Sequence, residues 1–182
     1  MYFRVSIKII VLVVVMLVLI SCSKSEMQLF YKSEMQLYMD DMVILDRYTD
    51  SSYKFVKVFD EMALVNSNTL TIKEKKAHLR NAQKVTNEVL AETIETLDAI
   101  HKIIPPKQCI STHVATIAIL QDNLQAYDSI KRFLNLSLSD NVTQRSYELA
   151  YFELDEASDL LRKSDREKVK LLGIMQDDKC LI

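Results

Sequence analysis

The sequence predicts an all-α protein: an up-down-up-down antiparallel four-helix bundle with long helices, preceded by a signal peptide and a short tether. Three observations carry this prediction. The 182 residues include one glycine and two prolines, which is too few for the turns of a β architecture and leaves long helices uninterrupted. Apolar residues recur at intervals of three and four, the spacing of one helical face. The connections between these stretches are short, so consecutive helices are expected to be antiparallel neighbours.

The first two helices are expected at about 33–65 and 72–104. Short polar side chains after Val65 end the first, because they compete for backbone hydrogen bonds. Thr71 and Glu74 have the spacing of a capping box, and Pro105-Pro106 ends the second helix. The predicted core face of the first helix is Met35, Tyr38, Met42, Leu45, Thr49, Ser52, Val56, Phe59 and Ala63, widened by Phe55, Leu64 and Val65. That of the second is Ala77, Leu79, Ala82, Val85, Val89, Leu90, Ile94, Leu97, Ile100 and Ile104.

The last two helices are expected at about 107–135 and 141–172, which places the bundle at 33–173 and a C-terminal tail at 174–182. Gly173 is the only glycine and stands where a left-handed helix cap is expected. The predicted core face of the third helix is Ile110, Val114, Ile117, Leu120, Leu124, Tyr127, Ile130 and Leu134. That of the fourth is Tyr147, Ala150, Tyr151, Leu154, Ala157, Leu161, Val169 and Leu172.

Charge is segregated along the fourth helix. Acidic residues fill its first two-thirds and basic residues its end. This order complements the helix dipole, so stability alone accounts for it. The alternative is an acidic band that docks a basic partner.

The N-terminus has the pattern of an export signal. Arg4 and Lys8 precede the apolar run Ile9–Ile20, and a small residue and a cysteine follow. Twelve residues rise only about 18 Å as a helix, and a membrane-spanning helix needs about 20 residues. The run is therefore a poor permanent anchor.

The four residues Leu19-Ile20-Ser21-Cys22 resemble the lipobox of bacterial lipoprotein precursors. The resemblance covers the signal alone and indicates nothing about residues 23–182. It implies a signal peptide at 1–21, cleavage before Cys22 and a diacylglyceryl group on the Cys22 sulfur. Separately, Ser25-Glu26-Met27-Gln28-Leu29 recurs as Ser33-Glu34-Met35-Gln36-Leu37, and we interpret the first copy as a spacer, which gives a lipidated tether at 22–32 between the lipid and the bundle. Two or three acyl chains, at about 0.8 kcal/mol per buried methylene, hold a protein on a bilayer stably. The competing interpretation is an ordinary cysteine beside an uncleaved helix or beside a signal cut elsewhere.

The charge of the chain limits the classes of partner that are expected. Loss of residues 1–21 removes Arg4 and Lys8, so the formal net charge of −2 becomes −4. No basic patch argues for nucleic acid. The expected partners are the lipid bilayer, through the acyl chains, and an envelope protein of unknown identity.

Two cysteines remain besides Cys22. Cys109 begins the third expected helix, and Cys180 lies just beyond the fourth. Those ends meet in an antiparallel pair, and an exported protein reaches a compartment where disulfides form. The alternatives are a Cys109–Cys180 disulfide or two separate thiols.

No pattern indicates catalysis, and we expect no enzyme, no metal site and no cofactor other than the lipid on Cys22. With one glycine the chain has no phosphate-binding loop and no nucleophile elbow. Asp98 and His101 form a single i, i+3 pair, whereas di-iron bundles need two such elements and further glutamates. Met35, Met39 and Met42 are spaced for copper(I) binding, but Met is more often a filler of bundle cores.

We therefore expect an exported lipoprotein, anchored by lipid, that acts as a non-enzymatic helical interaction or structural module. The position after Cys22 is occupied by Ser23 and not by the acidic residue that resembles an inner-membrane retention signal. In a cell with two membranes, the periplasmic face of the outer membrane is therefore expected. In a cell with one membrane, the outer face of the plasma membrane is expected. The alternative function is a ligand- or metal-binding bundle for capture or sensing at the envelope.

Overall fold

The computed structural model describes residues 34–66, 68–140, 143–177 and 180. The signal peptide, the Cys22 lipidation site and the tether at 22–32 lie outside these residues. The chain divides into two compact units, Met1–Asp41 and Met42–Ile182. In the first unit, residues 34–41 are helical. Among the described residues, none of the helices has the length and apolar character needed to cross a membrane.

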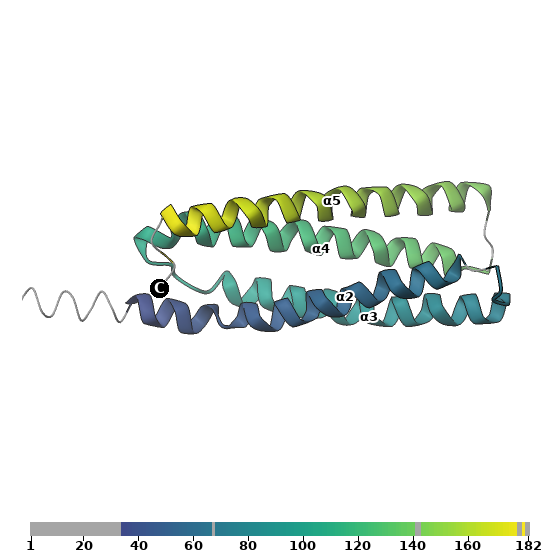
Figure 1. Cartoon of the computed structure of the whole chain (residues 1–182), viewed down its shortest axis with the longest axis horizontal. Coiled ribbons are helices and arrows are strands. Elements are labelled where there is room, and N and C mark those ends of the chain that lie inside the picture. The colour runs from purple at the N-terminus through teal and green to yellow at the C-terminus, as the bar shows by residue number, and fades with distance from the viewer. Residues whose placement is uncertain (1–33, 67, 141–142, 178–179, 181–182) are drawn as a thin grey trace, which may run out of the picture. The chain divides into compact units, whose positions relative to one another are not determined.

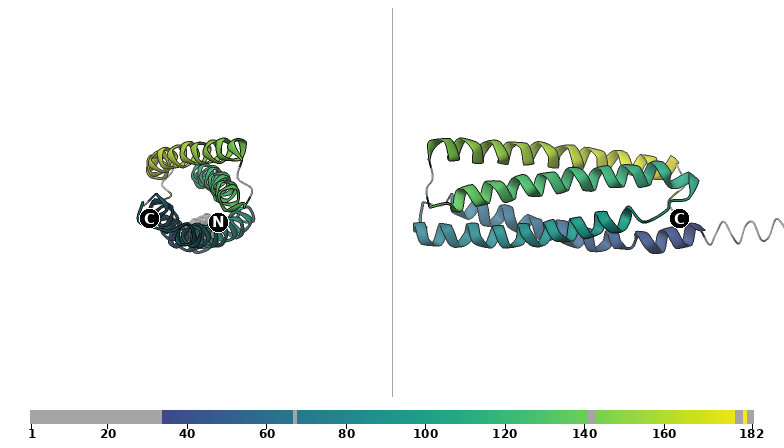
Figure 2. Two further views of the ribbon diagram at one scale, coloured as in Figure 1. Left: turned by 90° about the vertical axis from the view of Figure 1, so that its right-hand side faces the viewer. Right: turned by 180° about the vertical axis from the view of Figure 1, so that it is seen from behind.

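The second unit is all-α, as the sequence predicts, and its described residues include no strand (Figure 1). It contains four long helices and one short 3₁₀ helix: α2 (Ile44–Val65), α3 (Ile72–Ile100), η1 (Lys107–Cys109), α4 (Ile110–Leu138) and α5 (Gln144–Asp177). Extensive contacts join α2 to α3, α3 to α4 and α4 to α5. The views agree that α5 lies on one side of α4 and the α2–α3 pair on the other (Figure 2).

The helix ends follow the local chemistry of the sequence in most places. The predicted capping box before α3 is present, with the Glu74 amide donating to Thr71 Oγ1 at 3.3 Å and the Thr71 amide donating to Glu74 Oε2 at 2.8 Å. Hydrogen bonding from Thr71 holds the pKa of the Glu74 carboxyl below its usual value. α3 ends at Ile100, five residues before the first proline.

Gly173 does not cap α5, so that prediction is wrong. The helix continues through it to Asp177, and a Cβ added at Gly173 would meet no atom within 4 Å. The glycine is therefore an interior helical position that lacks a side chain, which weakens a helix relative to alanine.

All four long helices contribute to the core, and Ala157, Leu160 and Leu161 are the contribution of α5 to its main cluster. Phe55 of α2 packs on Tyr127 of α4, with ring centroids 4.3 Å apart. A main cluster surrounds this pair and a smaller one surrounds Tyr48. Three buried threonines, Thr86, Thr93 and Thr96, line the same side of α3 and donate their hydroxyls to carbonyl oxygens four residues earlier, at 2.7–2.8 Å. This local bond satisfies a polar group inside the core.

Several residues predicted for the core are exposed instead. In α3 and α4 these are Ala77, Ile94, Ile110 and Val114, and Ile104 is exposed in the connection beyond the end of α3, whereas Thr86, Thr93, Thr112 and Thr116 are buried. In α2 they are Thr49, Val56, Phe59, Ala63 and Leu64, and in α5 they are Tyr147, Tyr151, Val169 and Leu172. The α2 and α5 errors share one cause: extensive contacts reach α2 from α3 and α5 from α4, and none joins α2 to α5.

The Gly173→Ala substitution is expected to raise the free energy of unfolding by about 0.5–1 kcal/mol, because alanine restricts the unfolded chain and fits an open helical position. Chemical unfolding of both proteins, followed by circular dichroism, measures the difference. A loss of stability would contradict the interior-helix assignment and would restore the left-handed cap.

Candidate interaction surface

The fully buried residues of α5 form a narrow line of small side chains, and Leu160 and Leu161 beside it pack, partly buried, against the core. Ala150, Ala157 and Ser164 are buried and lie seven residues apart, so they form one line along the helix. Small side chains let α5 approach α4 closely. Because this line is narrow, most of the circumference of α5 is left uncovered.

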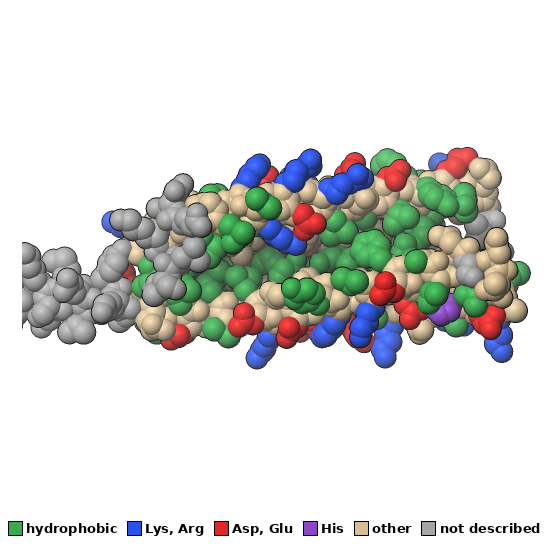
Figure 3. All heavy atoms as spheres, viewed as in Figure 1, with side chains coloured by type: hydrophobic (Ala, Val, Ile, Leu, Met, Phe, Trp, Pro, Cys, Tyr) green, Lys and Arg blue, Asp and Glu red, His purple; other side chains and the backbone are tan. Residues whose placement is uncertain are grey.

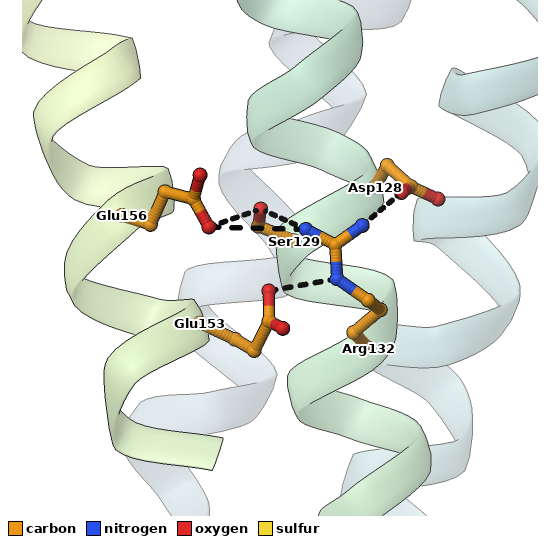
Figure 4. Close-up of polar contacts among 5 residues, drawn as sticks. All are labelled: Asp128, Ser129, Arg132, Glu153 and Glu156. Atoms are coloured by element: carbon orange, nitrogen blue, oxygen red, sulfur yellow. Dashed lines mark hydrogen bonds and ion pairs between the residues drawn. The ribbon is translucent and has the colours of Figure 1, made fainter. Parts of the chain in front are cut away.

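Arg132 of α4 joins α5 at the edge of this stripe (Figure 4). Its Nε donates to Glu153 Oε2 at 2.7 Å, and its Nη2 lies 3.8 Å from Glu156 Oε2. On its own helix the guanidinium contacts Asp128 and donates to Ser129 Oγ at 2.7 Å. The hydrogen bond with Glu153 is the main reason that the pKa of Arg132 lies above its usual value. One cation therefore bridges two helices through several charge-assisted bonds.

Two further links hold the C-terminal half of α5. Lys163 Nζ donates to Asp122 Oδ1 at 2.8 Å. Cys109 and Cys180 are joined in a disulfide that connects the start of α4 to the residues beyond α5, across 71 positions of sequence. On the chain-entropy estimate such a loop contributes about 4 kcal/mol by restricting the unfolded chain. The position of α5 on α4 is thus fixed at both its middle and its end.

An apolar groove separates α5 from α2. Figure 3 shows hydrophobic side chains filling a band between the two helices. Tyr147 and Tyr151 of α5 are about half exposed, and their rings pack with centroids 4.7 Å apart. On α2, Val56 is 55% exposed and Phe59 is 43% exposed. We call this region, between the exposed flanks of α2 and α5, the α2–α5 groove.

Several large apolar side chains that lie next to one another on the surface, each about half exposed, are unusual. Single exposed apolar residues are normal, whereas a contiguous patch marks a binding surface or an aggregation-prone one. The groove residues are the ones that the sequence pattern predicts to be core. The sequence pattern therefore predicts that another molecule or segment covers these side chains, and the described residues do not cover them.

A buried polar cluster lies where α2 meets α4. Asn123 Nδ2 donates to the hydroxyl of Tyr48, and Tyr48 is also hydrogen-bonded to Tyr127. Burial is the main cause that raises the pKa of both tyrosines, and Asp165 of α5 adds to it electrostatically. Within the described part of the chain, Asn123 Oδ1 and Ser164 Oγ are buried without a hydrogen-bond partner. Buried polar atoms of this kind cost about 1–3 kcal/mol each, so they are exceptions in a stable core.

Three histidines lie among the described residues: His78, His101 and His113. His78 pairs with Glu61 at 2.5 Å, and His101 Nδ1 lies 2.8 Å from the carbonyl oxygen of Leu97. His113 is buried, and burial is the main reason that its pKa is lowered, with His101 adding to the effect. No group of three or more His, Cys, Asp or Glu side chains that could hold a metal ion occurs among the described residues.

Sequence reasoning missed Arg132 and the threonines. A single arginine in an amphipathic helix gives no signal until the partner helix and its register are known. The threonine positions had a usable signal, because Thr86, Thr93 and Ala82, Val89 continue one helical line at intervals of three and four. The predicted core face of this helix holds apolar residues only, although in a helix the hydroxyl of threonine can bond to its own backbone.

The Arg132→Met variant is expected to lose about 1–2 kcal/mol of unfolding free energy, because it removes charge-assisted bonds between α4 and α5. Lys168→Met is the matched control. Its ion pair, to Asp165 at 3.0 Å, stays within α5 and is exposed, so a change below about 0.5 kcal/mol is expected. Urea unfolding of the three proteins compares them. Equal losses in both variants would show that Arg132 does not hold α5 to α4.

Comparisons of the chain with protein-family models, with curated proteins and with solved structures find no match.

Proposed function

We propose that this protein is an exported lipoprotein that uses an open helical unit as a non-enzymatic interaction module in the cell envelope. The observation that supports an interaction role best is the α2–α5 groove, a row of exposed apolar side chains along two helices (Figure 3). Anchoring is supported by the sequence alone, through the lipobox Leu19-Ile20-Ser21-Cys22.

The proposal includes the arrangement of the helices. We infer an up-down-up-down antiparallel bundle that is open on the side where α2 and α5 would meet. Two features support an open form. One is the set of extensive contacts, which links each helix to its chain neighbour but not the first to the last. The other is the exposure of both apolar flanks. A groove of this kind fits the apolar face of an amphipathic helix from an envelope protein.

The same features argue for surfaces rather than reaction chemistry. A catalytic site needs a nucleophile or acid–base groups held in mutual reach, in a concave site. Several ionisable residues of the described chain form ion pairs between helices, such as Lys54 with Glu92 at 3.1 Å and Lys163 with Asp122 at 2.8 Å. A non-enzymatic role is therefore the simpler proposal.

A second candidate is a ligand-binding bundle, and one observation favours it. Asn123 Oδ1 and Ser164 Oγ are buried and unpaired within the described chain, and Asp165 acts on the neighbouring tyrosines. Polar atoms in an apolar surround are typical of small-molecule sites. Native mass spectrometry of the mature protein separates the two functions, because a stoichiometric small molecule would favour ligand capture.

The anchor is tested by labelling cells with radioactive palmitate. The full chain is expected to incorporate the label and to fractionate with membranes, whereas Cys22→Ala is expected to lose both properties because it has no sulfur to alkylate. The matched control is Ser21→Ala, which keeps the cysteine and a small residue before it. Unchanged labelling or fractionation of Cys22→Ala would contradict the lipid anchor.

The interaction role is tested by photocrosslinking in intact cells. A photoreactive phenylalanine analogue at Phe59 or Tyr147, on the two walls of the groove, is expected to give the same protein adduct. The same analogue at Lys84, an exposed position of α3, is the control and is expected to give none. Adding Val56→Asp, which puts a charge into the groove, should remove the adduct. An adduct of equal yield from all three positions, or none from the groove, would contradict the proposal.

A further inference from the structure

α5 carries a second feature on the side away from its buried line of small residues. Six residues follow one another at steps of three and four, which keeps them on one helical face: Phe152, Asp155, Asp159, Arg162, Arg166 and Val169. We call them the outer stripe. All six are exposed, and Phe152 and Val169 are 64% and 72% exposed. A surface hollow on α5 borders five of them, from Phe152 to Arg166.

The helix dipole does not account for the charges of this stripe, so that part of the sequence interpretation is wrong. Dipole effects are confined to the first and last turns of a helix. The first turn of α5 has no acidic residue and the last turn has no basic one. The four charges of the outer stripe stand instead in the middle of the helix.

The order of these charges is also unfavourable within one helix. Asp155 and Asp159 are four residues apart, as are Arg162 and Arg166, and like charges at this spacing repel. An alternating order would have given attractive pairs at the same positions. One pair, Asp159 with Arg162 at 3.1 Å, is attractive, but its side chains are 81% and 70% exposed, where ion pairs contribute little.

The order becomes favourable when two stripes face each other in opposite directions. Read from Phe152, the stripe is apolar, acidic, acidic, basic, basic, apolar. The same stripe read backwards places a complementary residue at every position. We propose that the outer stripe is an interface between two copies of this chain, with their α5 helices antiparallel about a two-fold axis that passes between Leu160 and Leu161. Phe152 then faces Val169 of the second copy, Asp155 faces Arg166, and Asp159 faces Arg162.

Two-fold symmetry repeats each of these contacts, as in isologous dimers. A parallel, in-register pair would instead set aspartate against aspartate and arginine against arginine. The charges therefore select the antiparallel orientation and oppose the parallel one, while the two Phe152–Val169 contacts add apolar burial. Exposed ion pairs are weak and are screened by salt, so the dimer is expected to be weak and to weaken further at high ionic strength.

This interface is independent of the groove. The groove uses the flank of α5 that carries Tyr147, whereas the outer stripe is centred on Asp159 and Arg162. A result against one of the two proposed surfaces does not count against the other, because the substitutions below change no residue of the groove walls.

The test exchanges the two halves of the stripe. The swapped variant, Asp155→Arg, Asp159→Arg, Arg162→Asp and Arg166→Asp, keeps the net charge and reverses the order. The full chain is produced in cells in two versions with different C-terminal affinity tags. Membranes are extracted in mild detergent, and capture of one tag is scored by the recovery of the other. Thermal unfolding of each protein checks that the fold is kept.

Parent with parent and swapped with swapped are expected to co-purify to similar extents, since both stripes are self-complementary when antiparallel. Parent with swapped is expected to fall by about tenfold or more, because every antiparallel charge pair becomes repulsive, whereas a parallel pair would become attractive. Recovery of parent with swapped that equals or exceeds the matched pairs would overturn the proposal. So would recovery of parent with parent at the level of an unrelated tagged membrane protein.

Discussion

The structure of the second unit depends on the place of α4, which has α3 on one side and α5 on the other. Its buried residues are spread around much of its circumference and include polar ones such as Asn123 and Ser129. A helix covered on two sides holds its neighbours apart. α2 and α5 are therefore separated, and the apolar flank of each is left uncovered. The α2–α5 groove follows from the position of one helix rather than from a feature of the groove residues themselves.

Sequence patterns predicted the helices well and their faces less well. The capping box at Thr71 and Glu74, the end of α2 at Val65 and the proximity of Cys109 to Cys180 all depend on local rules or on chain order, and the structure has each of them. The faces of α2 and α5 failed at Val56, Phe59, Tyr147 and Tyr151 because a periodic pattern gives the apolar side of a helix but not the number of helices that cover it. Gly173 failed because a glycine near a helix end is ambiguous until the following residues are known to continue the helix.

The difference between the predicted and the observed helix faces also explains why the sequence does not predict the two candidate surfaces. The exposed apolar residues of the groove follow the same three-and-four spacing as core residues. The sequence pattern therefore predicts them to be buried and gives no sign of a groove. The order of charges along α5 suggests an interaction with the helix dipole, because the position of each charge along a helix is clear from the sequence. The face of the helix that meets its neighbour is not clear from the sequence. Both surfaces become apparent once the buried line of Ala150, Ala157 and Ser164 fixes which side of α5 meets α4.

The separation of α2 and α5 is tested most directly by the reactivity of cysteines placed on the groove walls of the full chain. Val56→Cys and Tyr151→Cys are expected to react with a water-soluble maleimide at rates near that of an exposed cysteine. Val58→Cys, at a fully buried position of the same helix, is expected to react at least about tenfold more slowly, and the parent chain gives the background from Cys22, Cys109 and Cys180. If the two groove cysteines are protected as strongly as the one at Val58, α2 and α5 close on each other and the open groove does not exist in solution.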